Sequence, residues 1–294
     1  MTLAGIAVVL PILLSAITIA VLLFATYTDL KTREVPDWLN FSLLGIALLI
    51  RILSSWLLAD WHPILEGVFG IALGFLFASL FFYTGQWGGG DGKLLIAMGA
   101  SLGFWPTIGH PSISFLVNLL LAGAVYGFCY SIWLAMSNRT AFLAELHSFL
   151  KTPKVRWMRR GMHAFAIGSI VLLIFLSSAF LRIIIGLVLA LIVFLFYGWI
   201  FSSVLEKSCL LRRVHPQQIT PGDWIAEDVR VGGKRICGPS DLGIEEHQIQ
   251  ELIKLNKQKK VGLVLVKYGI PFVPAFLLGF FMMLWLGNPL LIFL

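Results

Sequence analysis

The sequence contains little charge and very few cysteines. Only 13% of its 294 residues are charged, against about 25% in soluble globular domains. So little charge cannot cover the surface of a soluble protein, which excludes an ordinary cytosolic enzyme and a disordered chain. The three cysteines, Cys129, Cys209 and Cys237, include no Cys-x-x-Cys pair. We therefore expect free thiols, and neither a zinc site nor a disulfide framework.

Long apolar runs dominate what is present, since 59% of the residues are hydrophobic. The first run, Leu3 to Tyr27, has no Lys or Arg before it and is too long for a typical signal-peptide core, so we expect a membrane helix. A helix that crosses a bilayer needs about 20 apolar residues, and helices are the practical spanning form for such sequence. The runs lie at about 3–27, 38–59, 64–84, 93–105, 112–136, 163–181, 183–204 and 268–294.

These runs predict an all-α polytopic membrane protein with about eight transmembrane helices and a small cytosolic α+β insert. The fourth run, of about 13 residues, is short for a span. This run is expected to form a thinned span, a tilted span or a segment that neighbouring helices shelter. Only Arg182 separates the sixth and seventh runs. Together these two runs are about twice as long as a bilayer is thick, so we expect a tight helical hairpin there.

The spans divide the chain into successive parts. We expect membrane helices one to five, which carry the candidate aspartates, in residues 1–136. A cytosolic basic loop with an interfacial amphipathic helix is expected in 137–162, followed by membrane helices six and seven in 163–204. A cytosolic insert is expected in 205–267, and the last membrane helix in 268–294. The apolar stripe within 137–162 also fits a solvated linker.

The insert is the only stretch of soluble type, and it contains no catalytic constellation of its own. Gly232-Gly233 lies between two short segments rich in β-forming residues and predicts a hairpin. Residues 243–259 have the apolar spacing of an amphipathic helix, and residues 261–266 predict a further strand. Its role stays open between recruitment of substrate and of other partners. Deletion of 210–260 is expected to leave the chemistry intact.

The net charge of +7 is concentrated on one side of the predicted topology. With the N-terminus outside, eight spans place 20 of the 22 Lys and Arg residues in inner loops, while Arg182 falls outside and Arg51 lies within the second span. Cytoplasmic loops of membrane proteins carry such an excess of basic residues. The positive charge is therefore expected to meet anionic lipid headgroups, and nucleic acid is not an expected partner.

Acidic residues at or inside a membrane are costly and are candidates for function. Asp60 falls in an outer loop and Glu66 at the outer start of the third span, where hydration favours structural roles for both. Asp29 ends the first span and Asp91 begins the fourth. The topology derived from basic residues therefore places both aspartates at the cytoplasmic edge.

Two carboxyl groups in one site can activate water and also donate a proton. Because like charges at close range cannot both ionise cheaply, one group keeps a proton while the other stays anionic. The anion takes a proton from a water that attacks a carbonyl, and the acid protonates the leaving amine. Which aspartate plays which role stays open. The glycines at 88–90 allow a tight turn and close approach of a substrate strand, although they also fit a plain flexible loop.

Gly88-x-Gly90-Asp91 resembles the GxGD motif of polytopic aspartyl proteases. Asp29, followed by a basic residue and Pro36, resembles the first-aspartate motif of type IV prepilin and preflagellin peptidases. The resemblance covers about residues 20–105. It implies that Asp29 and Asp91 are catalytic and that Gly88 and Gly90 support the motif, with no metal and no cofactor.

The resemblance also implies an activity and a location. Such enzymes are aspartyl endopeptidases that cut class III signal peptides of pilin-like or archaellin-like precursors at the cytoplasmic edge of the cell membrane. Acidic loop residues such as Glu34 and Asp37 are candidates to bind the basic leader of a precursor. The first inner loop is short and lacks the cysteine-rich domain of bacterial members. Methyltransferase activity is therefore not expected, and the archaeal type is the closer likeness.

Three other interpretations stay open. An ion- or proton-coupled transporter would use Asp29 and Asp91 as ligands or relays, although both lie near one face and not at the midplane. A presenilin-like intramembrane protease shares GxGD and has Pro-Ala-Leu in a late span, where this chain has Pro274-Ala275-Phe276. We interpret these late prolines mainly as helix distortion near the inner boundary, with contact with a substrate strand as the alternative. A non-catalytic assembly protein would leave the aspartate pair unexplained.

Overall fold

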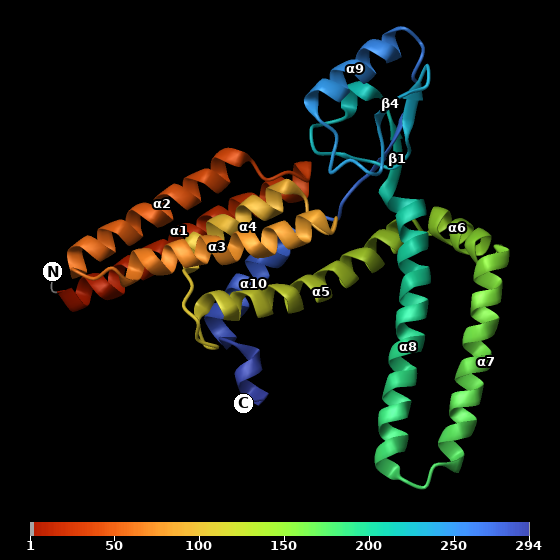
Figure 1. Cartoon of the computed structure of the whole chain (residues 1–294), viewed down its shortest axis with the longest axis horizontal. Coiled ribbons are helices and arrows are strands. Elements are labelled where there is room, and N and C mark those ends of the chain that lie inside the picture. Colours follow the sequence, from red (N-terminus) through yellow and green to blue (C-terminus); the bar gives the residue numbers. More distant parts are fainter. Residues whose placement is uncertain (1–2, 294) are drawn as a thin grey trace.

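Long apolar helices account for most of the chain. The computed structural model describes residues 3–293. Figure 1 shows helices α1 to α4 side by side in a bundle, with α5 and α10 packed against it, a separate helical hairpin and an insert that contains the strands. The helices of the bundle are α1 (Leu3–Thr32), α2 (Asp37–Leu58), α3 (His62–Tyr83), α4 (Gly89–Leu102), α5 (Pro111–Ser137) and α10 (Val273–Leu286), which is followed by the short 3-10 helix η3 (Pro289–Phe293).

The short helix α4 is sheltered between α2 and α3. Gly70 of α3 and Gly99 of α4 face each other so closely that a methyl group on either would overlap the backbone of the other. The 14 residues of α4 give a length of about 21 Å, less than the roughly 30 Å of a hydrocarbon core. Neighbouring helices therefore shelter the fourth apolar segment, one of the three arrangements expected for it.

A buried arginine closes the far end of α4. The Nε of Arg51 donates to the Ala100 carbonyl at 2.6 Å, and its Nη2 donates to the Ser101 carbonyl at 2.8 Å. These carbonyls belong to the last turn of α4, where the helix offers them no backbone donor. Arg51 also pairs with Glu66 at 3.3 Å. Asp60, in the adjacent α2–α3 turn, accepts from the His62 backbone N–H at 3.0 Å, so both acids have local partners here.

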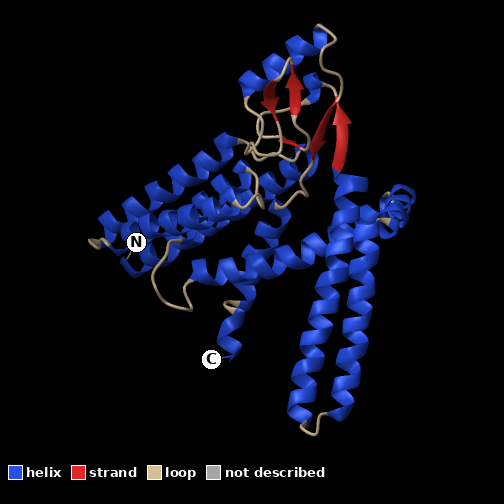
Figure 2. Cartoon of the chain, turned by 45° about the vertical axis from the view of Figure 1, so that its right-hand side comes forward, coloured by secondary structure: helices blue, strands red, loops and turns tan. Residues whose placement is uncertain are grey.

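The hairpin is formed by α7 (Pro153–Phe175) and α8 (Ala179–Leu205), with α6 (Arg139–Lys151) across one end. Figure 2 shows α7 and α8 extending away from the bundle, and the end of α5 packs on the hairpin where Leu134 and Ala135 meet Leu205. The turn lies at 176–178 and Arg182 is inside α8, so placing the turn at Arg182 was wrong. The physical reason is the Ser178 side chain, which accepts from the Leu181 N–H and caps α8. The helix therefore begins at Ala179, three residues before Arg182.

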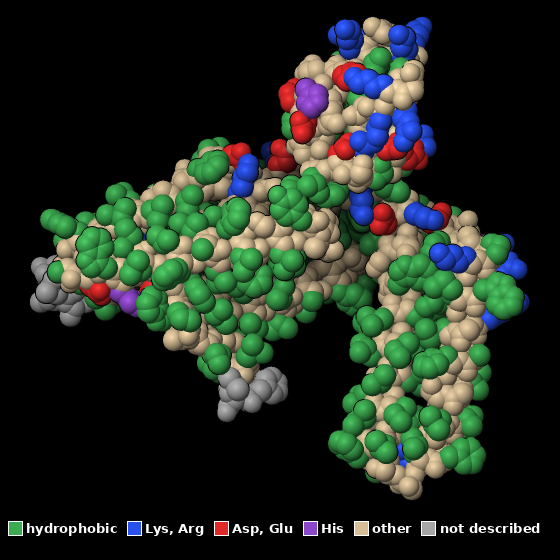
Figure 3. All heavy atoms as spheres, in the orientation of Figure 1, with side chains coloured by type: hydrophobic (Ala, Val, Ile, Leu, Met, Phe, Trp, Pro, Cys, Tyr) green, Lys and Arg blue, Asp and Glu red, His purple; other side chains and the backbone are tan. Residues whose placement is uncertain are grey.

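Seven of the described helices are long and apolar enough to cross a membrane: α1, α2, α3, α5, α7, α8 and α10. The sheltered α4 adds an eighth, shorter apolar helix. Figure 3 shows hydrophobic side chains over the bundle and the hairpin, whereas Lys, Arg, Asp and Glu gather on the insert and on the helix ends beside it. The predicted polytopic helical fold with a small α+β insert is confirmed.

The insert is built around strand β5 (Val264–Lys267), which lies between β1 (Leu211–Val214) and β2 (Trp224–Ile225) and runs antiparallel to both. A separate hairpin joins β3 (Val229–Val231) to β4 (Lys234–Cys237). Its turn residues, Gly232 and Gly233, have φ of 59° and 84°, as a two-residue hairpin turn requires. The remaining elements of the insert are the π-helix η1 (Glu206–Leu210), the 3-10 helix η2 (Pro216–Gln218) and α9 (Glu246–Lys257).

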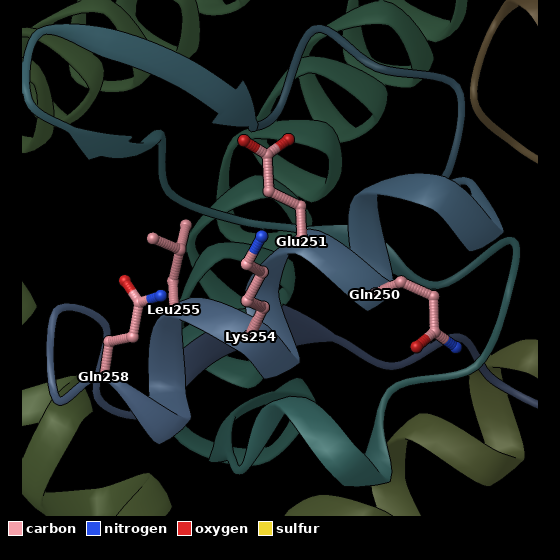
Figure 4. Close-up of a pocket in the computed structure, with 5 residues that line it drawn as sticks. All are labelled: Gln250, Glu251, Lys254, Leu255 and Gln258. Carbon is pink, nitrogen blue, oxygen red and sulfur yellow. The ribbon is translucent and has the colours of Figure 1, made fainter.

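A small apolar core holds the insert together. Ile225, Ile249, Leu252 and Val266 are buried in it, beside the buried thiol of Cys237. The predicted hairpin, helix and further strand are all present. The three cysteines of the chain are free, as expected. Figure 4 shows a surface pocket along α9, lined by Gln250, Glu251, Lys254, Leu255 and Gln258.

Candidate active site

The structure brings Asp29 and Asp91 to the same end of the bundle. Asp29 is in the last turn of α1, and Asp91 is in the first turn of α4. The two carboxyl groups are close enough to interact electrostatically. This is the end of the bundle that faces the insert (Figure 1). Asp60 and Glu66 lie at the opposite end, around the turn from α2 to α3, and are not part of this pair.

Asp29 is held by the beginning of the last helix. Its side chain is 5% exposed, and its Oδ2 accepts from the backbone N–H of Val273 at 2.9 Å. Val273 is the first residue of α10, and Pro274 follows it in the first turn. The first N–H groups of a helix lack partners within the helix and carry partial positive charge, so they stabilise a carboxylate. The chain therefore supplies a backbone donor that orients Asp29.

The late prolines begin this helix and do not distort its interior. Pro271 precedes α10, and Pro274 occupies its first turn, where a missing N–H costs no hydrogen bond. The distortion expected near the inner boundary is therefore absent from α10, because the prolines lie where the helix begins. The role of Val273 was missed, because a backbone donor can be supplied by any residue but proline. The sequence signal that marks the place is the pair of prolines, which is typical of a helix start.

The glycine-rich segment puts Asp91 near the start of α4. Gly88 is the extended residue before the helix, with φ of −73° and ψ of 165°, and the positive φ of this loop is at Gly85, 68°. The tight turn therefore uses Gly85 and not the glycines at 88–90. A Cβ added to Gly89 would meet no atom within 4 Å. One added to Gly90 would lie 3.4 Å from Val35 of the α1–α2 loop.

Aromatic side chains join the glycine loop to the start of α10. Trp87, directly before the glycines, is buried and stacks on Phe81 with ring centroids 4.3 Å apart. Phe272 and Phe276, on either side of the α10 start, each lie 5.4 Å from Trp87. The loop before Asp91 therefore packs directly on the segment that binds Asp29.

The charged residues around the α1–α2 loop differ in their availability. Lys93 donates to both carboxylate oxygens of Asp37, at 2.6 and 2.7 Å. Glu34 is exposed and lies near Asp223 of the insert, whose pKa is raised by burial and, to a smaller extent, by the charge of Glu34. Of the two acids expected to bind a basic leader, Asp37 already has a cation as partner.

The geometry is that of two carboxyl groups at one end of the bundle, beside a glycine-rich loop. A comparison with protein-family models finds a match in this part of the chain. Residues 16–132 match the model of the type IV leader peptidase family. This stretch contains both aspartates, the glycine loop and helices α2 to α4. The resemblance drawn from the GxGD motif is confirmed for this part of the chain.

Curated relatives agree with the family match. The chain is 32% identical over 98 residues to the preflagellin peptidase of Methanococcus maripaludis, which is 33% of this chain and 42% of the relative. It is 33% identical over 104 residues to that of Methanococcus voltae, 35% of this chain and 43% of the relative. The preflagellin peptidase of Methanocaldococcus jannaschii is 29% identical over 99 residues, 34% of this chain and 42% of the relative.

The aligned part spans less than half the length of the curated relatives that the chain matches. No solved structure is significantly similar.

Proposed function

We propose that the protein is a membrane aspartyl endopeptidase that cleaves class III signal peptides of archaellin-like or type IV pilin-like precursors. The single observation that carries the proposal is the meeting of Asp29 and Asp91 at one end of the bundle, within the stretch that matches the leader peptidase family. The preflagellin peptidase relatives favour archaellin-like precursors among these substrates.

In the proposed reaction the two carboxyl groups act as one acid–base pair. One aspartate is anionic and removes a proton from the attacking water, while the other donates its proton to the carbonyl oxygen of the scissile bond. The first aspartate then passes the proton taken from water to the leaving amine, and the collapsing diol returns a proton to the second aspartate. The Val273 N–H keeps the Asp29 carboxyl group oriented through this cycle. The open side of Gly89 lets a substrate backbone approach beside Asp91 without meeting a side chain. The titration belongs to the pair, so neither role is assigned to one residue.

The active site is proposed to face the cytoplasm. The aspartates lie at the bundle end beside the insert, and most Lys and Arg residues lie in the insert and in the helix ends near it (Figure 3). Basic residues are enriched on the cytoplasmic side of membrane proteins. A precursor with a basic leader in the cytoplasm and an apolar segment in the bilayer would present its cleavage site at this level. We propose cleavage without N-methylation.

Cleavage by the reconstituted protein tests the proposal. The full chain in liposomes is expected to shorten an archaellin-like precursor, and N-terminal sequencing of the product is expected to place the cut between the basic leader and the apolar segment. Asp29→Asn and Asp91→Asn are each expected to lower the rate about 10²- to 10⁴-fold. Asp60→Asn, at the other end of the bundle, is the matched control and is expected to cleave at the wild-type rate.

Two results would overturn the proposal. Either asparagine variant could cleave as fast as the wild type, which would remove the pair from the reaction. Alternatively, the wild type could leave the precursor intact and instead show proton flux that depends on the aspartates, as a transporter would. The comparisons give no support to a transporter.

A further inference from the structure

The insert touches both segments that carry the aspartates. Trp224 of β2 lies over Gly85, in the loop that leads to Asp91, at 3.4 Å from the position of an added Cβ. Asp223, its neighbour in sequence, lies near enough to Glu34, five residues beyond Asp29, for the charge of Glu34 to raise its pKa. A recruitment module joined by a flexible tether would not need to pack on the glycine loop, so the insert is packed onto the site region.

Tyr268 makes a further contact, at the point where the insert returns to the membrane. Two guanidinium groups lie over its ring, that of Arg33 at 5.1 Å and that of Arg212 at 5.6 Å from the ring centroid. Arg33 ends α1, with a positive φ of 60° and its N–H bound to the Asp29 carbonyl at 2.8 Å. Arg212 is in β1. A cation over an aromatic face is stabilising by about 0.5–2 kcal/mol, so Tyr268 joins the sheet to the end of α1.

The segment after Tyr268 is fixed at both ends. Tyr268 donates its backbone N–H to the Leu210 carbonyl at 2.9 Å, which extends the pairing of β5 beyond Lys267. Four residues later, Phe272 packs on Trp87, the residue before the glycine run. The next residue, Val273, donates to Asp29. The linker 268–272 therefore ties the central strand of the insert to both aspartate-bearing segments.

We propose that the insert is a positioning element of the aspartate site. Through Tyr268 and the linker 268–272 it sets the start of α10, and the start of α10 orients the Asp29 carboxyl group. The expected effect on kcat rests on the proposed peptidase function. The expected effect on hydrogen exchange at Val273 does not depend on any activity. The positioning role also predicts that the insert cannot be removed without loss of the chemical step, contrary to the expectation from the sequence.

Lengthening the linker tests this proposal without changing a side chain. Two glycines inserted between Gly269 and Ile270 separate the strand from α10, and two glycines inserted between Gly232 and Gly233 lengthen the exposed β3–β4 turn as the matched control. In full-length protein in nanodiscs, the linker variant is expected to lose at least about tenfold in kcat, with KM changed by less than about threefold. Its Val273 amide is expected to exchange hydrogen faster. The turn variant is expected to match the wild type in all three.

Substitutions of Tyr268 provide a second variant in case the lengthened chain does not fold. Tyr268→Ala removes the ring over which the two guanidinium groups lie and is expected to lower kcat and to speed exchange at Val273. Tyr268→Phe keeps the ring and is expected to restore both. Unchanged kcat and unchanged protection in the linker variant and in Tyr268→Ala would overturn the positioning role.

The outcomes separate the two proposals. If the wild type cleaves and the linker variant cleaves equally well, the peptidase stands and the positioning role fails. If the wild type cleaves no precursor, the peptidase fails, and exchange at Val273 alone decides the role of the linker. Faster exchange in the linker variant supports it, and unchanged exchange contradicts it.

Discussion

Asp29 and Arg51, two buried charged residues of the bundle, have different kinds of partners. The guanidinium of Arg51 is bound to the Ala100 and Ser101 carbonyls and to the Glu66 carboxylate. These partners use most of its donors, as expected of a group that holds helices together. The Asp29 carboxyl group accepts from a backbone N–H, which orients it and leaves acceptor capacity for water or substrate. The partners of Arg51 therefore hold helices together, whereas the Asp29 carboxyl group keeps acceptor positions for a further donor.

Replacement of Arg51 is predicted to destabilise the bundle. Arg51→Leu leaves the last carbonyls of α4 and the Glu66 carboxylate without their buried partner, which is expected to cost about 3 kcal/mol or more of unfolding free energy. Arg182→Leu is the matched control because Arg182 is exposed in the first turn of α8. Unfolding in detergent with increasing denaturant measures both. Equal unfolding midpoints for the two variants would contradict the capping role of Arg51.

The thiol of Cys237 is predicted to be unreactive while the insert is folded. Burial, and secondarily the charge of Asp241, raises its pKa to about 11, and only the thiolate is an effective nucleophile. In a Cys129→Ser, Cys209→Ser background at pH 8, a maleimide is expected to label Cys237 only after the insert unfolds. Labelling should increase as the pH rises toward 11, because deprotonation forms the thiolate. Rapid labelling at pH 8 in the native protein would show that the core of the insert is open.

At the scale of elements, the packing of α3 on α4 sets the position of Asp91. The backbones approach at Gly70 and Gly99, where neither helix has a side chain. This contact, together with the arginine at its far end, fixes a helix that is too short to cross the bilayer alone. The depth of Asp91 in the membrane is thus set by its neighbours and not by the length of its own helix.

Adding a methyl group to this contact is predicted to separate the two helices. Gly99→Ala places a Cβ within the backbone of α3, and such overpacking typically costs about 1–3 kcal/mol. Gly45→Ala is the matched control, since Gly45 is in α2 and an added Cβ there meets nothing within 4 Å. Gly45→Ala is expected to be neutral or to stabilise slightly, because alanine favours a helix more than glycine does. Thermal unfolding compares the two, and an equally stable Gly99→Ala would contradict the close packing.

Element boundaries were predictable where they depend on local chemistry. The β3–β4 turn follows from Gly232 and Gly233, which readily adopt positive φ. The turn of the α7–α8 hairpin was misplaced because a charged residue, Arg182, was taken as the boundary, whereas a serine cap at Ser178 decides it. Charge marks where a segment meets water, and capping marks where a helix begins.

At the scale of the whole molecule, the order of the spans explains why the aspartates meet. The distribution of Lys and Arg residues among the loops predicted that Asp29 and Asp91 lie on the same side of the membrane, and neither aspartate was used in that prediction. The contact between Asp29 and Val273 joins residues 244 positions apart and could not be predicted, because a backbone N–H has no signature in sequence. The packing of the insert on the glycine loop depends on tertiary structure for the same reason.

The most direct test of the account compares kcat/KM for Asp29→Asn, Asp91→Asn and the double variant on one archaellin-like precursor. Groups that act as a unit are strongly non-additive. Each single variant is therefore predicted to lose about 10²- to 10⁴-fold, and the double variant is predicted to lose little more than the worse single variant. Multiplicative losses in the double variant, or a single variant within a few-fold of the wild type, would contradict a shared acid–base site.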